Sequence, residues 1–197
     1  AKDLQANGVF GIFPANKTDA EDVALYRDEE DLEEIARFHF LRQQNQEGSQ
    51  KPNKSLSDYI APASLGHLDY IGAFAVTAGI GSEKAQEKYK EDDYKNLLVQ
   101  SLSDRLAEAF AEHLHERVRK EFWGYSPDEH LSNAELIAEK YPGIRPAAGY
   151  PACPEHSEKA TIFQLLHAPK NAGISLTEND AMHPASSVSG WYMAYPD

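Results

Sequence analysis

The sequence is poor in cysteine and in positive charge, and it contains no long hydrophobic run. Its single cysteine, Cys153, excludes an internal disulfide framework and is typical of a reducing compartment such as the cytoplasm. No stretch approaches the ~18 uncharged apolar residues that a membrane span needs. Residues 1–5 contain no apolar core of a signal peptide. We therefore expect a cytoplasmic chain without a membrane partner.

Basic residues are scarce, with 19 Lys and Arg against 32 Asp and Glu, and the formal net charge is −13. Such a chain is a poor nucleic-acid binder, because phosphate recognition needs clustered Lys and Arg. The one basic cluster is formed by Arg117, Arg119 and Lys120. Two interpretations stay open: local steering of an acidic partner, and cations placed at the C-terminus of a helix. The residues alone favour the second.

The length of 197 residues and the 41% apolar content predict one globular domain over residues 1–197. Strands are expected at 9–13, where a turn at 14–16 follows, and at 22–27, 69–77 and 187–194. Residues 45–54 are expected to form a loop. Helices are expected from about 83 until Gly124 and Pro127 close the pattern, from 132 to about 141 and over 157–166. Because strands and helices do not alternate strictly, α+β is the predicted class.

The long predicted helix carries apolar residues at spacings of three and four, which indicates one face of an amphipathic helix. The residues of this face are Tyr94, Leu98, Leu102, Leu106, Ala109, Phe110, Leu114 and Val118. The next helix begins with a capping signature, because Ser132 precedes Glu135 by three.

The segment 143–156 carries the most chemistry. It contains three prolines and two glycines, which make a rigid loop without regular structure. Arg145 could bind a carboxylate through its guanidinium fork, and Tyr150 could donate a hydroxyl. The alternative is a connector in which Arg145 makes an internal ion pair. Composition leaves both open.

The residues do not support two other kinds of site. Cys153 and His156 lie three apart, but two ligands do not make a structural zinc site, and we predict no bound metal. Gly79 and Gly81 follow a strand as in a free-standing methyltransferase with a Rossmann-like fold, but the alternating strands and helices of that fold are missing. The pair is expected to end the strand.

The segment 145–156 resembles the signature of the activation domain of cobalamin-dependent methionine synthase, in which an Arg-x-x-x-Gly-Tyr pattern binds S-adenosylmethionine. Collinear matches extend the resemblance from about residue 9 to residue 197. They cover residues 69–77, 104–112, 115–120, 122–125 and 187–192.

The resemblance implies a C-shaped α+β domain with a twisted antiparallel sheet and flanking helices. It implies that the domain binds S-adenosylmethionine and donates the methyl group to cobalamin that a flavodoxin-type donor has reduced. The parent enzyme would be 5-methyltetrahydrofolate–homocysteine methyltransferase. Cobalamin would be carried by a separate domain, so the isolated chain is expected to bind ligand without turnover. The family domain is longer, and we expect truncation at both ends.

The resemblance also implies roles for individual residues. S-adenosylmethionine would be bound by Arg145, Ala147, Gly149 and Tyr150, with Glu108 and Glu139 near its cationic end. Asp104 and Tyr150 would contact the cobalamin domain, although an ordinary exposed helix carboxylate is the favoured alternative for Asp104. Arg117, Arg119 and Lys120 would dock the acidic electron donor.

One alternative function remains at this point. The chain could be a non-catalytic interaction module that docks a corrinoid protein or a flavodoxin-type reductant. Binding of S-adenosylmethionine would separate the two functions.

Overall fold

A computed structural model describes residues 4–18, 21–44 and 52–195. The chain forms two compact units. The first contains Ala1–Gly11, Ala73–His113 and Lys159–Gly190, and the second contains Ile12–Gly72, Leu114–Glu158 and Trp191–Asp197. Each unit is described by itself.

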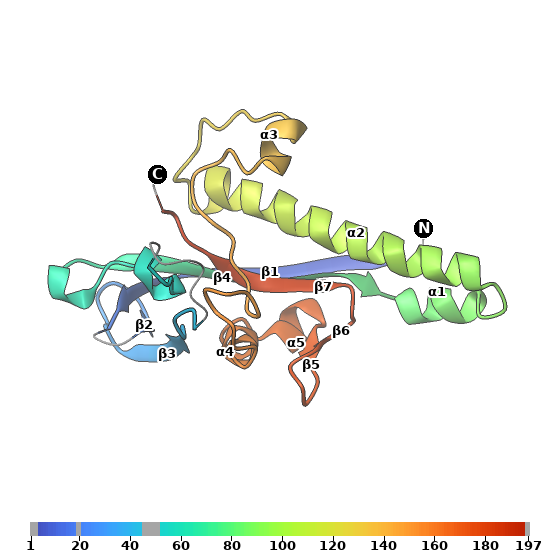
Figure 1. Ribbon diagram of the computed structural model, residues 1–197, viewed down its shortest axis with the longest axis horizontal. Helices are drawn as coiled ribbons and strands as arrows, with labels where there is room; N and C mark the ends of the chain where they lie inside the picture. Colours follow the sequence, from blue (N-terminus) through green and yellow to red (C-terminus); the bar gives the residue numbers. More distant parts are fainter. Residues whose placement is uncertain (1–3, 19–20, 45–51, 196–197) are drawn as a thin grey trace. The chain divides into compact units, whose positions relative to one another are not determined.

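The described residues contain strands, α-helices and short helical turns of other types (Figure 1). The strands are β1 (Gln5–Lys17), β2 (Asp22–Tyr26), β3 (Glu34–His39), β4 (Asp69–Ile80), β5 (Ser175–Leu176), β6 (Met182–His183) and β7 (Ser187–Tyr192). The α-helices are α1 (Ser82–Lys88), α2 (Asp93–Arg117), α3 (Asn133–Ile137), α4 (Glu158–Leu165) and α5 (Ala168–Ala172). Turns of 3₁₀ helix cover Leu56–Tyr59 and Ala63–Leu65, and a π-helical turn covers Val118–Phe122.

The main sheet has the strand order β3-β2-β1-β4-β7. The pairs β1–β2 and β2–β3 are antiparallel, and β5 and β6 form a second antiparallel pair. An antiparallel sheet with flanking helices is therefore present, which confirms the predicted α+β class.

Helices cover both faces of the strands in the first unit, with α2 on one face and α4 and α5 on the other (Figure 1). Two consecutive residues of β1 illustrate this. Asn7 donates a side-chain hydrogen bond to the carbonyl of Ala172 in α5. A Cβ atom at Gly8 would lie 3.0 Å from the ring of Phe110 in α2. Glycine therefore lets α2 approach the sheet closely.

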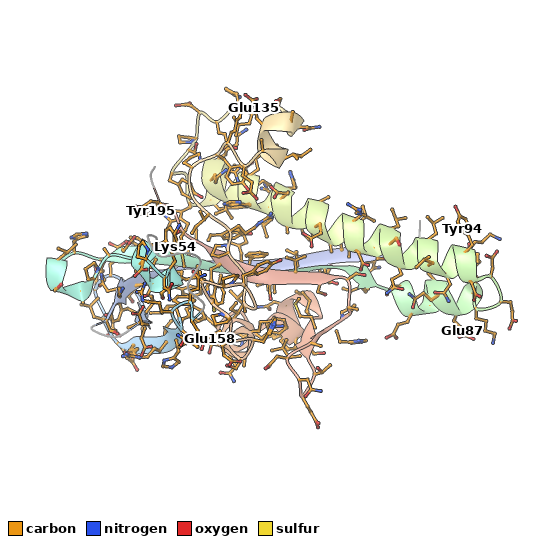
Figure 2. All side chains as sticks on the ribbon, viewed as in Figure 1. Lys54, Glu87, Tyr94, Glu135, Glu158 and Tyr195 are labelled. Atoms are coloured by element: carbon orange, nitrogen blue, oxygen red, sulfur yellow. The ribbon has the colours of Figure 1, made fainter. Side chains whose placement is uncertain are left out.

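The predicted apolar face of α2 is wrong over its first half. Tyr94, Leu98, Leu102 and Leu106 are 44% to 75% exposed, and Tyr94 is labelled in Figure 2 on the first turn of the helix. The buried side carries the small residues Ser103, Ala107 and Ala111 instead. Periodicity identified an amphipathic helix, but close helix–sheet packing selects small residues.

An aromatic cluster fills the core of the second unit. Trp191 is fully buried and meets the rings of Phe38 and Phe40 edge-on, with centroids 5.4 and 5.0 Å away. Such edge-to-face pairs add to the gain from burial alone. The cluster joins β3 to the end of β7, and so fixes the backbone at residues 191–193.

Several expected boundaries differ from the structure, among them the end of α3, which lies at Ile137 and not near residue 141. Pro14 is expected to begin a turn, but β1 continues through it to Lys17. Proline has no N–H to donate, and the residues of β1 that pair with β2 are Ala15, Asn16 and Lys17, which follow it. The long helix is interrupted between α1 and α2, because the Asp92 side chain accepts from the Lys95 amide and caps a new helix. β4 runs through Gly79 to Ile80. Residues 45–51 of the expected loop lie outside the described residues.

The largest correction concerns Arg119, which was predicted to lie in a surface patch. Its side chain is fully buried, and Nε and Nη2 donate to the two carboxylate oxygens of Glu129 at 2.7 and 2.6 Å. The capping signature at Ser132 and Glu135, by contrast, is confirmed by reciprocal hydrogen bonds. Within the described ranges, no helix is long and apolar enough to span a bilayer.

We predict that Arg119→Met destabilises the chain strongly. The change leaves the Glu129 carboxylate buried without its counter-charge, at a cost of about 3–5 kcal/mol. The control is Arg117→Met, which breaks an exposed pair with Glu121 and should cost at most about 1 kcal/mol. Urea unfolding followed by circular dichroism measures both. Equal midpoints for the two variants would contradict the assignment of Arg119 to the core.

Candidate functional site

A cavity of about 690 Å³ lies in the second unit. Its volume falls in the range of about 300–1,000 Å³ that is typical of small-molecule sites. Two residues that the sequence analysis selected, Arg145 and Glu139, both line it. The remaining lining residues are Leu56, Tyr59, Lys140, Tyr141, Gly143, Ile144, Pro146 and Ala152.

The backbone around Arg145 is held firmly. Ile144 and Met193 exchange backbone hydrogen bonds of 2.9 and 3.1 Å, and the Trp191 amide donates to the Pro146 carbonyl at 2.9 Å. Residues 144–146 therefore extend the sheet beside the chain that follows β7. A guanidinium starting from a fixed backbone needs to order fewer bonds when it binds an anion.

Glu139 occupies an unusual backbone conformation beside the cavity. Its φ angle is +53°, in the left-handed region that glycine favours. Its amide donates to the Leu136 carbonyl, and the Lys140 amide donates to the Glu135 carbonyl, which closes the end of α3. A residue with a side chain is strained there, and the strain is located where a carboxylate borders the cavity.

A layer of aromatic and charged groups lies behind the cavity wall. The guanidinium of Arg119 lies over the ring of the lining residue Tyr141, 4.0 Å from its centroid. The ring of His115 meets Tyr141 edge-on at 5.0 Å and stacks on Tyr192 at 5.1 Å with an interplanar angle of 13°. The wall residue Tyr141 is thus packed against a cation over its ring and against an imidazole in a T-shaped contact.

His115 is the most unusual member of this layer. Its side chain is fully buried, and neither ring nitrogen has a hydrogen-bond partner among the residues that the structure describes. Burial, reinforced by the positive charges of Arg119 and Arg145, lowers the pKa of His115 to about 2. The ring is therefore neutral at physiological pH.

The loop that follows Arg145 turns tightly. Gly149 has a φ of +95°, its amide donates to the Cys153 carbonyl, and the Cys153 amide donates back to the Tyr150 carbonyl. Tyr150 is 67% exposed. Within the described part of the chain, Ala147, Gly149 and Tyr150 do not belong to the cavity lining, so their ligand-binding roles stay predictions.

Burial raises the pKa of the Cys153 thiol to about 12, so the thiol is a poor nucleophile and a poor metal ligand at neutral pH. Over residues 4–18, 21–44 and 52–195, no three His, Cys, Asp or Glu side chains are grouped as a metal site would require.

The other predicted residues lie elsewhere in the chain. Glu108 and Asp104 are exposed on α2 in the first unit, and Asp104 accepts a 2.6 Å hydrogen bond from Ser186. Arg117 and Lys120 pair with carboxylates one helical turn away, Glu121 at 2.8 Å and Glu116 at 3.4 Å. Their positive charge is therefore largely compensated locally.

Several cavity residues escaped the sequence analysis. Leu56 and Tyr59 come from a 3₁₀ turn whose first amide, that of Leu56, donates to the carbonyl of Ala152. Tyr59 also packs edge-on against Tyr195, which Figure 2 labels. Only the tertiary fold brings residue 56 beside residue 152, and no local pattern signals it.

Comparison with known proteins yields consistent matches. The family model described as "Vitamin B12 dependent methionine synthase, activation domain" matches residues 1–197. A solved structure described as "Crystal Structure of the MetH Reactivation Domain bound to AdoHcy" is similar, with a TM-score of 0.94 and 54% sequence identity. The match covers 100% of this chain and 60% of that chain. The chain thus spans less than two thirds of the length of this relative.

We predict that Gly143→Ala disrupts the cavity wall. Gly143 has a φ of +82°, and a Cβ atom there would lie 2.9 Å from the Met193 carbonyl oxygen and 2.6 Å from the Tyr125 hydroxyl. The control is Gly124→Ala, with a φ of +74° and nothing within 4 Å. Both variants incur backbone strain of roughly 1–2 kcal/mol, so thermal unfolding should show a clearly greater loss for Gly143→Ala. A smaller or equal loss would contradict the observed packing.

We also predict that acid destabilises the chain through His115. The pKa of His115 in the folded chain lies below its unfolded value of 6.5. Its contribution to the free energy of unfolding is therefore fully present above pH 6.5 and is lost as the pH falls below that value. One such group costs about 2 kcal/mol between pH 7 and pH 5. The measurement is denaturant unfolding of the wild type and of His115→Phe across this pH range. Burial raises the pKa of Glu158 in both proteins, so the difference between the two profiles reports His115 alone. Parallel pH profiles would refute the prediction.

Proposed function

The chain belongs to the family of activation domains of vitamin B12-dependent methionine synthase, and from this premise we propose that its Arg145 cavity binds S-adenosylmethionine. The bound ligand would supply an electrophilic methyl group for transfer to reduced cobalamin. The similar MetH domain was solved with AdoHcy bound, which is what remains of S-adenosylmethionine after methyl transfer. One observation carries the proposal: Arg145 and Glu139 line a single cavity of suitable volume.

The chemistry of the lining suits this ligand. S-adenosylmethionine carries a carboxylate, an ammonium group, a sulfonium and an adenine. The Arg145 guanidinium is suited to the carboxylate through two charge-assisted hydrogen bonds. The Glu139 carboxylate is suited to the ammonium end. The rings of Tyr59 and Tyr141 offer flat apolar surface of the kind that an adenine stacks on.

Methyl transfer from a sulfonium requires neither a general acid nor a general base. It requires that the methyl group be aimed at its acceptor and that water be kept away. Residues of this chain would therefore act by binding and orientation. The neutral ring of His115 and the high pKa of Cys153 fit a site without proton transfer.

Partners of the domain follow from the same proposal. The cobalamin domain of the same enzyme would approach the exposed Tyr150 and, on α2, Asp104. An acidic flavodoxin-type donor would be steered by Arg117 and Lys120, a weak patch because both cations are paired. Without the cobalamin domain the chain would bind ligand and turn over nothing. A cytoplasmic location accords with the single, buried cysteine.

The test is calorimetric titration of the chain with S-adenosylmethionine. We expect saturable binding that Arg145→Ala weakens by roughly 10- to 100-fold, since hydrogen bonds to charged groups contribute about 1.5–3 kcal/mol. Arg145→Lys should fall between, because it keeps the charge and loses the fork. Arg27→Ala, which breaks exposed ion pairs with Asp31 and Glu33, should bind as wild type does.

A second ligand sharpens the design. 5′-Methylthioadenosine keeps the adenosine and lacks the amino-acid carboxylate. Its affinity should therefore be the same for wild type and Arg145→Ala. Equal binding of S-adenosylmethionine by wild type and Arg145→Ala would reject the assigned role of Arg145, and no binding by the wild type would reject the proposed site.

A further inference from the structure

The first half of α2 is apolar on two sides. The buried side carries Ser103, Ala107 and Ala111, which are at most 1% exposed. The opposite side carries larger apolar residues that are 44% to 75% exposed, and we call it the α2 apolar face: Tyr94, Leu97, Leu98, Leu102 and Leu106. A helix that is apolar all round is normally buried all round. Contiguous exposed apolar residues of this kind mark a surface that another element covers.

The spacing within this face indicates what kind of element fits it. The residues at 94, 98, 102 and 106 follow one another at intervals of four and form a single ridge along the helix. Such ridges pack into the grooves of a second helix. Arg105 is exposed on the same side, three residues after Leu102. A covering helix would therefore offer apolar side chains to the leucines and a polar or acidic group to Arg105.

The solved relative contains chain that could supply this helix. The MetH domain matches all of this chain, but the match covers only 60% of the MetH domain. The rest of that domain has no counterpart in residues 1–197. A covalently linked segment acts at a high effective concentration, whereas a second copy of this chain would bring one net charge of −13 against another. A segment of the same polypeptide is therefore the favoured occupant.

The two ends of the described chain differ in where they lie. β1 begins at Gln5, and a Cβ atom at Gly8 would lie 3.0 Å from the ring of Phe110 in α2. The start of β1 therefore lies beside α2, within the first unit. The other end belongs to the second unit, where Tyr195 packs against Tyr59. The stretch that precedes β1 is thus the one that starts out beside the helix.

We propose that the α2 apolar face is the packing site of a helix from the stretch of the parent methionine synthase chain that precedes β1. The covering helix buries the leucines and ties that stretch to the first unit. The inference goes beyond the proposed function, because it involves neither the Arg145 cavity nor its ligand. Failure of one proposal leaves the other standing.

The first test measures how fast a maleimide labels Leu102→Cys, with mass spectrometry to assign the label. Cys153 gives little background, because it is buried and burial raises the pKa of its thiol to about 12. The control is Glu178→Cys, since Glu178 is exposed in the same unit, between β5 and β6 and away from α2 (Figure 1). Both thiols should react rapidly in the 197-residue chain. Once the natural sequence that precedes residue 1 is added, Leu102→Cys should react at least about ten-fold more slowly, while Glu178→Cys keeps its rate.

A chain extended only after residue 197 separates the possible occupants. Protection of Leu102→Cys by that extension alone would overturn the choice of the preceding stretch. No protection by either extension would overturn the proposal as a whole. Protection in the unextended chain that increases with protein concentration would identify a second copy as the occupant, and would overturn the proposal as well.

The second test uses thermal unfolding. Leu98→Gln combined with Leu102→Gln should shift the midpoint of the 197-residue chain by less than about 2 °C, because both side chains are exposed there. The same two changes in the chain extended before residue 1 should lower the midpoint by more than about 5 °C, because they remove buried leucines. Equal shifts in the two chains would contradict the proposal, even if the cysteine variant failed to fold.

Discussion

The candidate site depends on the pairing of residues 143–146 with the end of β7 and the chain that follows it. Gly143 and Ile144 donate to the carbonyls of Tyr195 and Met193, Met193 donates back to Ile144, and Trp191 donates to Pro146. The partner chain is itself anchored, because Trp191 is buried in the aromatic cluster of the second unit. A surface loop is thereby converted into an extension of the sheet, and the Arg145 side chain begins from a backbone that has little freedom.

The charged groups at the site form two layers, one behind the cavity wall and one in its lining. Behind the wall, the charge of Arg119 is cancelled by Glu129 at hydrogen-bond distance, and His115 is neutral. In the lining, Arg145, Lys140 and Glu139 present both signs of charge to the cavity. The Arg119–Glu129 pair behind the wall carries no net charge, as a buried site requires. The charged residues of the lining therefore determine which ligand charges are favoured. A zwitterionic amino acid suits such a lining.

Local sequence patterns predicted many local features correctly, and the wrong predictions concerned features that depend on tertiary contacts. Prolines and glycines identified the rigid loop at Arg145, and the spacing of Ser132 and Glu135 identified the start of α3. Burial of Arg119 could not be foreseen, because its partner Glu129 lies ten residues further along the chain, beyond the π-helical turn, and no helical spacing pairs the two. The leucines of α2 misled for another reason. Periodicity identifies an apolar face, whereas the distance between helix and sheet decides whether large or small residues meet the strands.

Two of the residues that break local rules lie at the same cavity, Glu139 in its lining and His115 behind its wall. Glu139 adopts a conformation suited to glycine, and His115 is buried without hydrogen bonds among the described residues. Each costs stability of order 1–3 kcal/mol, and a glycine or a phenylalanine would relieve it. Family membership and 54% identity to a MetH domain identify the fold but do not explain these costs. Local rules are expected to fail at functional sites, so Glu139 and His115 agree with a site at Arg145, whereas His167 and Asp180 share the left-handed backbone without lining this cavity.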